Sequence, residues 1–293
     1  MPLKEISIFR RHGRQYVPDL RNVELTPLFR GRPVISDNIT SEEAETVINL
    51  CPTGAISDLR FTVDDLRFPD YDFRFPSSGL PPSPELTRHA SRVTRHDSSS
   101  SDLCIDLGKC VFCKECQFAL PGKITFTNDY KIATNSREAM IIQTGEDKPV
   151  MLDPEKIRKE IKSFFRHALK LRQVSAGGDN SCEMELNAAG NVNFDMGRYG
   201  IEFVASPRHA DGIVITGPIT ENMAEALQIC YDAVPDPKII ILCGTDAISG
   251  GIFANSPALN RSFLDKYPID LYVPGNPVHP LTFINGVLGL IQM

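Results

Sequence analysis

The stretch that decides the fold is residues 212–243, which read GIVITGPITENMAEALQICYDAVPDPKIIILC. Its two ends, residues 212–216 and 238–243, are short apolar runs, and residues 220–233 between them have the pattern of a helix. Continuous apolar runs on both sides of a helix are typical of strands that are buried on both faces of a parallel sheet. This stretch therefore predicts a strand–helix–strand unit of an α/β fold.

The same pattern continues outward in both directions. Residues 201–205 and 271–273 are further short apolar runs that we interpret as buried strands. Residues 175–293 are therefore predicted to form an α/β domain with a parallel, flavodoxin-like sheet covered by helices on both faces.

Residues 146–174, just before this domain, are predicted to form a linker helix. Asp153 suits the N-cap position and Pro154 the first helical position. The apolar residues that follow lie on one helical face: Ile157, Ile161, Phe164, Phe165 and Ala168. The basic residues that suit its C-terminal end are Arg166, His167 and Lys170.

Three of the eight cysteines lie close together in CVFCKECQFALP, residues 110–121. Cys110, Cys113 and Cys116 are too close to be bridged into three separate loops, and this spacing indicates metal ligation in a chain without a visible secretory signal. Two-cluster bacterial ferredoxins contain the run C-x2-C-x2-C-x3-C-P twice. The first three cysteines of each run bind one cluster, and the fourth binds the other.

Applied to this chain, the crossover rule gives one complete ligand set and one set without thiols. The run at residue 110 has leucine at its fourth position, and CPTGAI at residues 51–56 has the form of the end of an earlier run. The complete set is Cys51, Cys110, Cys113 and Cys116. The other set, counted back from residue 51, is Ser41, Ala44, Val47 and Leu120. The sequence therefore predicts one 4Fe-4S cluster on the complete set.

Zinc, bound with some fourth partner, is the alternative for these cysteines. Structural zinc sites usually combine two C-x2-C pairs, whereas triple spacing followed by proline is more typical of an iron–sulfur cluster. Cys104, Cys230 and Cys243 fall outside the motif, and we expect them to be core residues.

Three segments carry a resemblance to a known family: CPTGAI, CIDLGKCVFCKECQFALP and FTNDYKIATNSREAMII. They resemble the ferredoxin-type subunit of complex I and of the energy-converting NiFe hydrogenases, including formate hydrogenlyase. The resemblance implies an α+β ferredoxin-like domain at residues 35–145, preceded by a basic extension at residues 1–34. Near residues 75–101, SSGLPPSPE and a run of four serines indicate a flexible insert.

The second half carries a stronger resemblance, in FFRHALKLRQVSAGGDNSCEMEL, GIEFVASPRHADGIVITGPITENMAEAL, PDPKIIILCGTDAISGGIF and IDLYVPGNPVHPLTFINGVL. These segments are similar to the small, proximal-cluster subunit of the same complexes, over nearly all of residues 165–293. The chain therefore looks like a fusion of two subunits that are usually separate.

The second resemblance implies a further cluster site whose ligands have mostly changed. The family's four cysteines fall on Asp179, Cys182, Asp246 and Asn276, and Glu183 follows the second position as it does in the family. One thiolate, two carboxylates and an amide are a poor set for iron–sulfur and suit a hard cation better. We expect this proximal cluster to be lost, although the loops directly follow predicted strands, where parallel sheets form ligand crevices.

Composition limits the classes of partner. The formal net charge of −6 gives no electrostatic reason to expect nucleic acid or an anionic membrane surface. No run approaches the roughly 20 apolar residues that span a bilayer, and MPLKEISIFRRHGRQ lacks the apolar run of a signal peptide. We therefore expect a cytoplasmic protein that is peripheral to the inner face of the membrane through partners.

Three functional hypotheses remain open. The first is an electron-transfer subunit, not itself a catalyst, that works with the large subunit and membrane subunits of a complex I-like or hydrogenase-like complex. The second is a scaffold or assembly subunit whose cluster is structural or redox-sensing. The third is a new metal or small-molecule site that uses Asp179, Cys182, Glu183 and Asp246.

Overall fold

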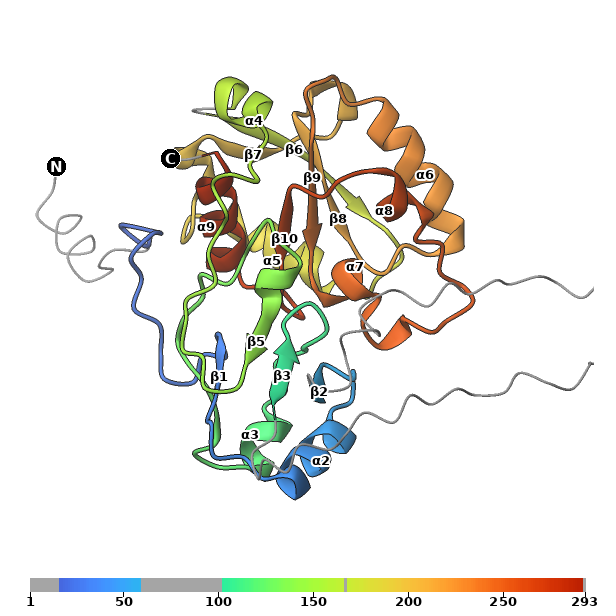
Figure 1. Ribbon diagram of the computed structural model, residues 1–293. Coiled ribbons are helices and arrows are strands. Elements are labelled where there is room, and N and C mark those ends of the chain that lie inside the picture. The colour runs from blue at the N-terminus through green and yellow to red at the C-terminus, as the bar shows by residue number, and fades with distance from the viewer. Residues whose placement is uncertain (1–15, 59–101, 166–167, 292–293) are drawn as a thin grey trace, which may run out of the picture.

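The structure, a computed structural model, describes residues 16–58, 102–165 and 168–291. The half that starts at residue 168 is built on a parallel sheet, and the half before it contains two antiparallel sheets (Figure 1). The predicted insert near residues 75–101 lies outside the described residues, as do residues 1–15 of the predicted extension. Within the described residues, no helix is long and apolar enough to cross a membrane.

The C-terminal half contains a five-stranded sheet in the order β10-β9-β8-β6-β7, in which every neighbouring pair is parallel. The strands are β6 (Leu169–Ser175), β7 (Ile201–Phe203), β8 (Gly212–Thr216), β9 (Ile239–Cys243) and β10 (Leu271–Val273). Counted along the chain this is the order 2-1-3-4-5, which is the flavodoxin-like arrangement. The prediction of a parallel α/β domain is confirmed.

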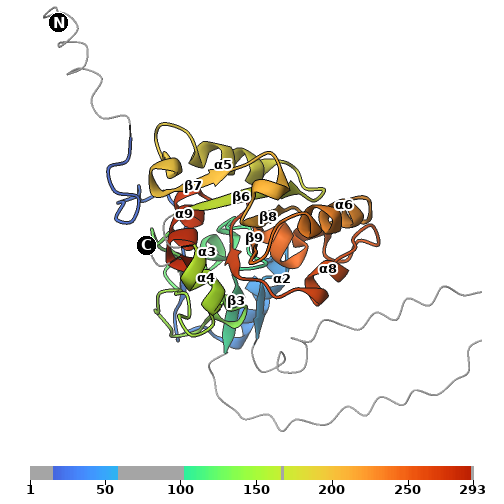
Figure 2. The same cartoon turned by 90° about the horizontal axis from the view of Figure 1, so that it is seen from above.

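Helices cover both faces of this sheet, which is why its central strands β8 and β9 are buried throughout. The helices are α5 (Ser181–Ala189), α6 (Glu221–Asp232), α7 (Thr245–Ser249), α8 (Ser262–Lys266) and α9 (Pro280–Leu290), with the short 3-10 turns η3 (Met196–Tyr199), η4 (Pro207–His209) and η5 (Gly251–Phe253). In β9, Ile240 packs in one core cluster with Leu227 of α6, whereas Ile241 packs in a second with Leu186 of α5 and Phe283 of α9. Figure 2 shows α5 and α6 on opposite sides of the sheet.

Most of the predicted elements of this half are confirmed. Strands β8 and β10 have the predicted bounds, and β7 and β9 are shorter by two residues and one residue. Helix α6 is flanked by Thr220 as its N-cap and Ala233 as its C-cap.

The predicted linker helix is largely wrong. The only helix described in that segment is α4 (Lys159–Phe164), and Asp153 accepts the N–H of Glu155 in a turn instead of capping a helix. Of the predicted apolar face, Ile157, Ile161 and Phe165 are buried, but Phe164 is 71% exposed. Ala168 is exposed as well, and Arg166 and His167 lie outside the described residues.

Strand β6 takes the place of the end of that helix. Leu169 and Leu171 are fully buried and alternate with the exposed Lys170, which is the two-residue period of a strand. β6 also pairs with both β7 and β8, so its hydrogen bonds depend on strands more than 30 residues away. These long-range partners override the local helical pattern, and the α/β half begins at Leu169 instead of residue 175.

The N-terminal half is an α+β arrangement of small sheets and short helices. β1 (Pro33–Ile35) pairs with β4 (Ile124–Phe126), and a second sheet has the order β2-β3-β5, both sheets being antiparallel. The remaining elements are β2 (Ile56–Asp58), β3 (Leu103–Asp106), β5 (Ile141–Gln143), α2 (Ser41–Leu50), α3 (Glu115–Ala119) and the 3-10 turn η2 (Glu138–Met140). The last paired residues of β2 and β3 are Asp58 and Leu103, so the chain leaves and re-enters this sheet at neighbouring positions.

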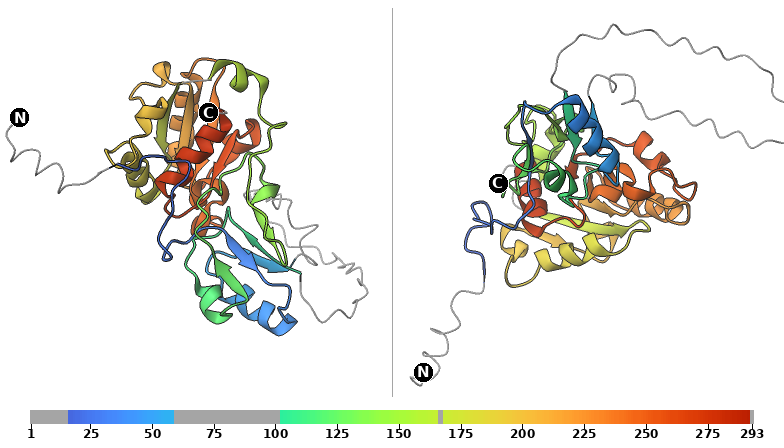
Figure 3. Two further views of the ribbon diagram at one scale, coloured as in Figure 1. Left: turned by 90° about the vertical axis from the view of Figure 1, so that its left-hand side faces the viewer. Right: turned by 90° about the horizontal axis from the view of Figure 1, so that it is seen from below.

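The described part of the predicted N-terminal extension packs on the α/β half before it reaches β1 (Figure 3). Leu20 is fully buried, and its carbonyl accepts a hydrogen bond from Asn285 of α9 at 2.8 Å. The N–H of Val17 donates to the carbonyl of Asn193 at 2.8 Å. β1 already begins at Pro33, inside the range predicted for the extension.

Candidate metal centre

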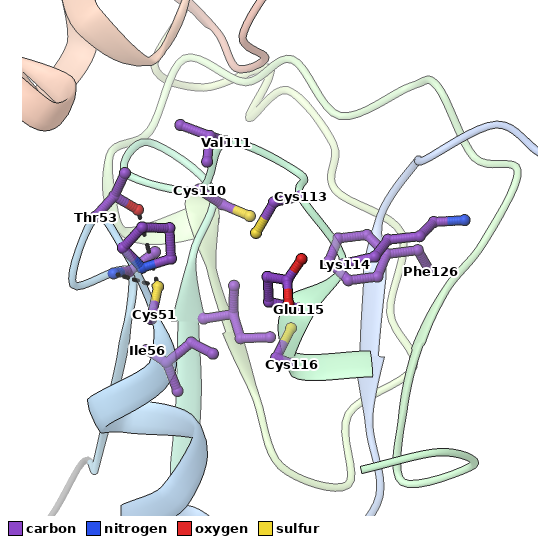
Figure 4. A pocket seen from close by; sticks show the side chains of 13 residues that line it. Cys51, Thr53, Ile56, Cys110, Val111, Cys113, Lys114, Glu115, Cys116 and Phe126 are labelled. Atoms are coloured by element: carbon purple, nitrogen blue, oxygen red, sulfur yellow. Dashed lines mark hydrogen bonds between the residues drawn. The ribbon is translucent and has the colours of Figure 1, made fainter. Parts of the chain in front are cut away.

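The structure brings the four cysteines of the complete set to one pocket (Figure 4). Cys51 follows the last residue of α2, Cys110 and Cys113 lie on the loop between β3 and α3, and Cys116 lies on α3. Apart from the cysteines, the walls of this pocket are mainly apolar. Side chains 59 residues apart in sequence, Cys51 and Cys110, thus face a common space.

The backbone of the cysteine loop is bent to bring these side chains together. Phe112 and Lys114 have φ values of 54° and 68°, in the left-handed region that non-glycine residues seldom adopt. Each such residue costs about 1–2 kcal/mol. Two contacts hold Phe112 in place: Arg30 donates to its carbonyl at 3.0 Å, and its ring packs edge-on against Phe126. A strained loop held in this way is typical of a ligand-binding site.

The surroundings of the sulfur atoms suit thiolate ligands. The N–H of Ala55 donates to Sγ of Cys51 at 3.2 Å, and the N–H of Phe112 donates to Sγ of Cys110 at 3.3 Å. Burial raises the pKa of Cys110 to about 12 and that of Cys116 to about 11, and the neighbouring cysteines add to both shifts. Bound metal supplies the positive charge that offsets this cost of ionisation.

A single zinc ion and a multi-iron cluster need different spacings of their sulfur ligands. Four sulfurs on one zinc ion, each about 2.3 Å from the metal, stand about 3.8 Å apart. Among the described residues, no three Cys, His, Asp or Glu side chains are placed to hold a single metal ion together. A multi-iron cluster, by contrast, binds its four thiolates at separate corners.

The positions of the second ligand set form hydrophobic core instead of a pocket. Helix α2 begins with a capping box, in which Thr40 accepts the N–H of Glu43 and Glu43 accepts the N–H of Thr40. Ala44 and Val47 on its inner face are buried in one cluster with Leu120. The fourth position of the set, Ser41, is exposed at the start of the helix.

The four positions predicted for a proximal cluster lie beyond the carboxyl ends of β6, β9 and β10. Asp179 is exposed and accepts the N–H and hydroxyl of Ser181, and Cys182 is buried in the first turn of α5. Asp246 lies in α7 and Asn276 in the loop after β10, both partly buried. The loops therefore have the predicted placement relative to the strands.

The carboxylates at this edge of the sheet have different surroundings. Burial, with a contribution from Asp179, raises the pKa of Asp246, whose Oδ1 atom is buried without a hydrogen-bond partner. Glu183 is buried on the other side of α5, where it accepts the hydroxyl of Thr216 at 2.6 Å. In the part of the chain that the structure describes, these carboxylates and Cys182 do not gather as three ligands of one ion.

Helix α7 connects the two sites. The hydroxyl of Thr245 lies 2.9 Å from the carbonyl oxygen of Cys110 and 3.2 Å from that of Gly275. Ile248 packs so closely on Gly108 that a Cβ there would lie 2.7 Å from its methyl group. Helix α7, which carries Asp246, thus packs directly against the loop that carries Cys110.

Sequence reasoning missed the residues that support the cysteine loop. Asp106 accepts the N–H of Gly108 at 2.8 Å and forms a bidentate salt bridge with Arg137. Neither this pair nor Thr245 shows a local pattern, because each partner is far away in the sequence. In the sequence, only the Asp-x-Gly spacing from Asp106 to Gly108 could have indicated the turn that supports the loop.

The chain is also similar in sequence to known proteins. The sequence profile of the NADH ubiquinone oxidoreductase 20 kDa subunit family matches residues 180–290. The probable membrane-bound hydrogenase subunit mbhJ of Pyrococcus furiosus is 35% identical over 134 residues, which are 46% of this chain and 80% of that protein. The chain belongs to the 20 kDa subunit family.

Further similarities each cover part of this chain. A NADH-quinone oxidoreductase subunit of Heliobacterium modesticaldum is 44% identical over 110 residues, covering 37% of this chain and 63% of that protein. A chain from the structure of the membrane-bound sulfane sulfur reductase, an archaeal respiratory membrane complex, is 29% identical with a TM-score of 0.39, over 44% of this chain and 71% of that one.

Proposed function

We propose that the chain is an iron–sulfur electron-transfer subunit of a membrane-bound respiratory complex, and that it holds one 4Fe-4S cluster on Cys51, Cys110, Cys113 and Cys116. The observation that carries the proposal is that these four thiols, from separate segments, line one pocket of mainly apolar walls. The names of its relatives, a membrane-bound hydrogenase subunit and subunits of NADH-quinone oxidoreductases, support the type of complex.

When bound, the cluster supplies a one-electron redox couple. The protein's own contribution is to hold the four sulfurs and to shield them from water. The N–H groups of Ala55 and Phe112 lower the electron density on two of the sulfurs, and Phe126 and Ile105 exclude solvent from the pocket. The chain itself forms no bonds to a substrate in this proposal.

The proposed organisation is a fusion of two subunits. Residues 35–145 are the ferredoxin-type, ferredoxin-like domain, and the α/β half is the small-subunit domain, with the family match inside it. The proposed partners are a large subunit, which docks on the α/β half, and through it membrane subunits. Attachment to the membrane is then peripheral.

We further propose that the proximal cluster of the α/β half is lost. Only Cys182 provides a thiol among the four matched positions, and the carboxylate of Asp246 stands where a thiolate is needed. Electrons that leave the remaining cluster then reach their acceptor without passing through a proximal cluster.

Anaerobic reconstitution of the purified chain tests the proposal. We expect about four iron and four sulfide per chain, since this is the composition of the cluster, together with a paramagnetic signal upon reduction. Cys110→Ser should lose the signal, whereas the matched variant Cys104→Ser should keep it, because Cys104 is a buried cysteine outside the pocket. Iron bound without sulfide, or a signal that survives Cys110→Ser, would contradict the proposal.

A scaffold subunit is the second candidate, and the degenerate proximal site favours it. In that case the cluster acts as a structural staple or redox sensor, and no electrons pass through the α/β half. Cys113→Ser separates the two: a relay loses electron transfer in an assembled complex, whereas a scaffold loses assembly while any complex that forms keeps its turnover.

A further inference from the structure

The loop that carries Cys110 and Cys113 is held from outside by an arginine that belongs to no motif of the sequence. Arg30 lies 82 residues before Phe112 in the chain, and its Nη1 atom donates to the carbonyl of Phe112 at 3.0 Å. Phe112 itself lies between Cys110 and Cys113, two of the proposed cluster ligands. A side chain of the N-terminal segment therefore contacts the backbone of the metal-binding loop.

The backbone next to Arg30 is held close to its neighbours. The N–H of Gly31 donates to the carbonyl of Thr127 at 2.8 Å, and a Cβ on Gly31 would lie only 2.2 Å from the carbonyl oxygen of Asp129. Only glycine allows so close an approach. The following residue, Arg32, is buried and forms an ion pair with Asp129 at 3.5 Å. Arg30 thus reaches the cysteine loop from a fixed position.

Phe112 connects the guanidinium group to a ligand sulfur. Its carbonyl accepts the hydrogen bond from Arg30, and its own N–H donates to Sγ of Cys110 at 3.3 Å. The φ of Phe112 is 54°, a left-handed value that a non-glycine residue keeps only when its surroundings hold it there. Because the hydrogen bond from Arg30 is one of the contacts that hold it, its loss should loosen the N–H that points at Cys110.

The charge of the guanidinium group is also close to this sulfur. Two hydrogen bonds and the covalent bonds within Phe112 separate Nη1 of Arg30 from Sγ of Cys110, so the two atoms lie within about 10 Å of each other. Reduction adds one negative charge to a bound cluster. A nearby cation and an N–H···S hydrogen bond both favour the more negative state, and both therefore raise the reduction potential.

We propose that Arg30 is a positioning residue that raises the reduction potential of the 4Fe-4S cluster. It acts through the backbone of Phe112, which it holds in the left-handed conformation, and through its positive charge. The inference rests on the proposed function, because it concerns the potential of that same cluster. It adds a determinant of the potential that lies outside the cysteine motif.

Redox titration of the reconstituted full chain, followed by the paramagnetic signal, tests the inference. At an ionic strength of about 0.01 M the screening length is about 30 Å, and Arg30→Gln should lower the midpoint potential relative to the parent. Arg30→Lys keeps the charge and a donor, so its midpoint should lie closer to the parental value. Because Arg30 is exposed, about 1 M salt should reduce the difference between the parent and Arg30→Gln.

Arg21→Gln is the matched control. It removes the same charge from an exposed arginine of the same segment, whose guanidinium group lies over the ring of Tyr199 in the α/β half. A parental midpoint in Arg30→Gln overturns the inference, as does an equal shift in Arg21→Gln or in Arg30→Lys. If Arg30→Gln binds no cluster, Arg30→Lys decides: binding restored by lysine supports the inference, and no binding overturns it.

A second readout needs no cluster. In the reduced, metal-free chain, Cys110 is 8% exposed and should be alkylated faster in Arg30→Gln than in the parent. Cys104, which faces the hydroxyl of Ser57 at 3.1 Å, should react at the same rate in both. Equal rates at Cys110 would show that Arg30 does not hold the loop. A parent that binds no cluster would end the proposed function, whereas a bound cluster whose midpoint ignores Arg30 would end only this inference.

Discussion

Thr245 lies fully buried between the loops that carry Cys110 and Gly275, one from each half of the molecule. Its single hydroxyl hydrogen is within reach of both carbonyl oxygens. A valine of the same shape would leave these two carbonyls without this donor, and no water could easily replace it in a packed interior.

We predict that Thr245→Val lowers the free energy of unfolding by about 1–3 kcal/mol, the cost of unsatisfied buried polar groups. It should also speed the loss of the cluster, because the Cys110 loop is no longer held. Chemical denaturation and the decay of the visible absorbance of the reconstituted protein measure the two effects.

Thr46→Val is the matched control, because this threonine donates to the carbonyl of Glu42 on an exposed helix surface. A change within about 0.5 kcal/mol is expected there. Equal effects of the two substitutions would mean that the link at Thr245 contributes nothing particular to the fold.

At the scale of elements, the start of α9 depends on an uncharged histidine. Nδ1 of His279 accepts the N–H of Leu281 at 3.2 Å, and the ring packs edge-on against Phe29 and Phe194. Burial lowers the pKa of His279 below its ordinary value of 6.5. A protonated ring would lose the cap and place a positive charge at a helix N-terminus.

This predicts a pH-dependent stability with a defined sign. Between the lowered pKa of His279 in the fold and about 6.5, the unfolded chain binds more protons than the folded chain. Stability is therefore complete above pH 6.5 and is lost as the pH falls through the folded value. His279→Asn keeps a capping side chain and should remove this part of the dependence in urea denaturation curves. The exposed His209 gives the comparison, since His209→Asn should leave the dependence unchanged.

Helix α2 contributes Ala44 and Val47 to the same hydrophobic core as Leu120, which follows α3. Leu120→Ala should lower the free energy of unfolding by about 2–5 kcal/mol, because it opens a cavity beside Ala44 and Val47. Leu50 is the last residue of α2 and is 42% exposed, so Leu50→Ala should lower the free energy of unfolding by about 0.5 kcal/mol or less. Neither side chain lines the cysteine pocket, so thermal melts should change while the reconstituted cluster signal persists.

The elements that could be predicted from the sequence are those whose burial is visible in the pattern of apolar residues within their own segment. The apolar runs of β8, β9 and β10 are signals of this kind. β6 could not be predicted, because Leu169 and Leu171 follow a helical pattern that continues into them until the pairing with β7 and β8 is known. The cysteine spacing likewise predicted which side chains meet, but not the supporting contacts of Arg30, which come from a distant segment.

At the scale of the whole molecule, residues 16–31 join the two halves before β1 begins. Leu20 is the fully buried anchor of this segment, whereas Leu28 is 84% exposed. Leu20→Ser should release the segment, so that trypsin cleaves after Arg21 and Arg30 faster than in the parent. Leu28→Ser should be cleaved at the parental rate. Parental protection in Leu20→Ser would show that other contacts hold the segment in place.

The pairing of Asp58 with Leu103 has a consequence for how this gene can be shortened. Antiparallel neighbours can be joined by a two-residue turn, so the sheet itself does not require a long connection between β2 and β3. A version of the chain with Asn-Gly in place of residues 59–102 would have every hydrogen bond described for β2, β3 and β5 available to it. The pairing of β2 with β3 therefore does not account for the length of this 44-residue connection.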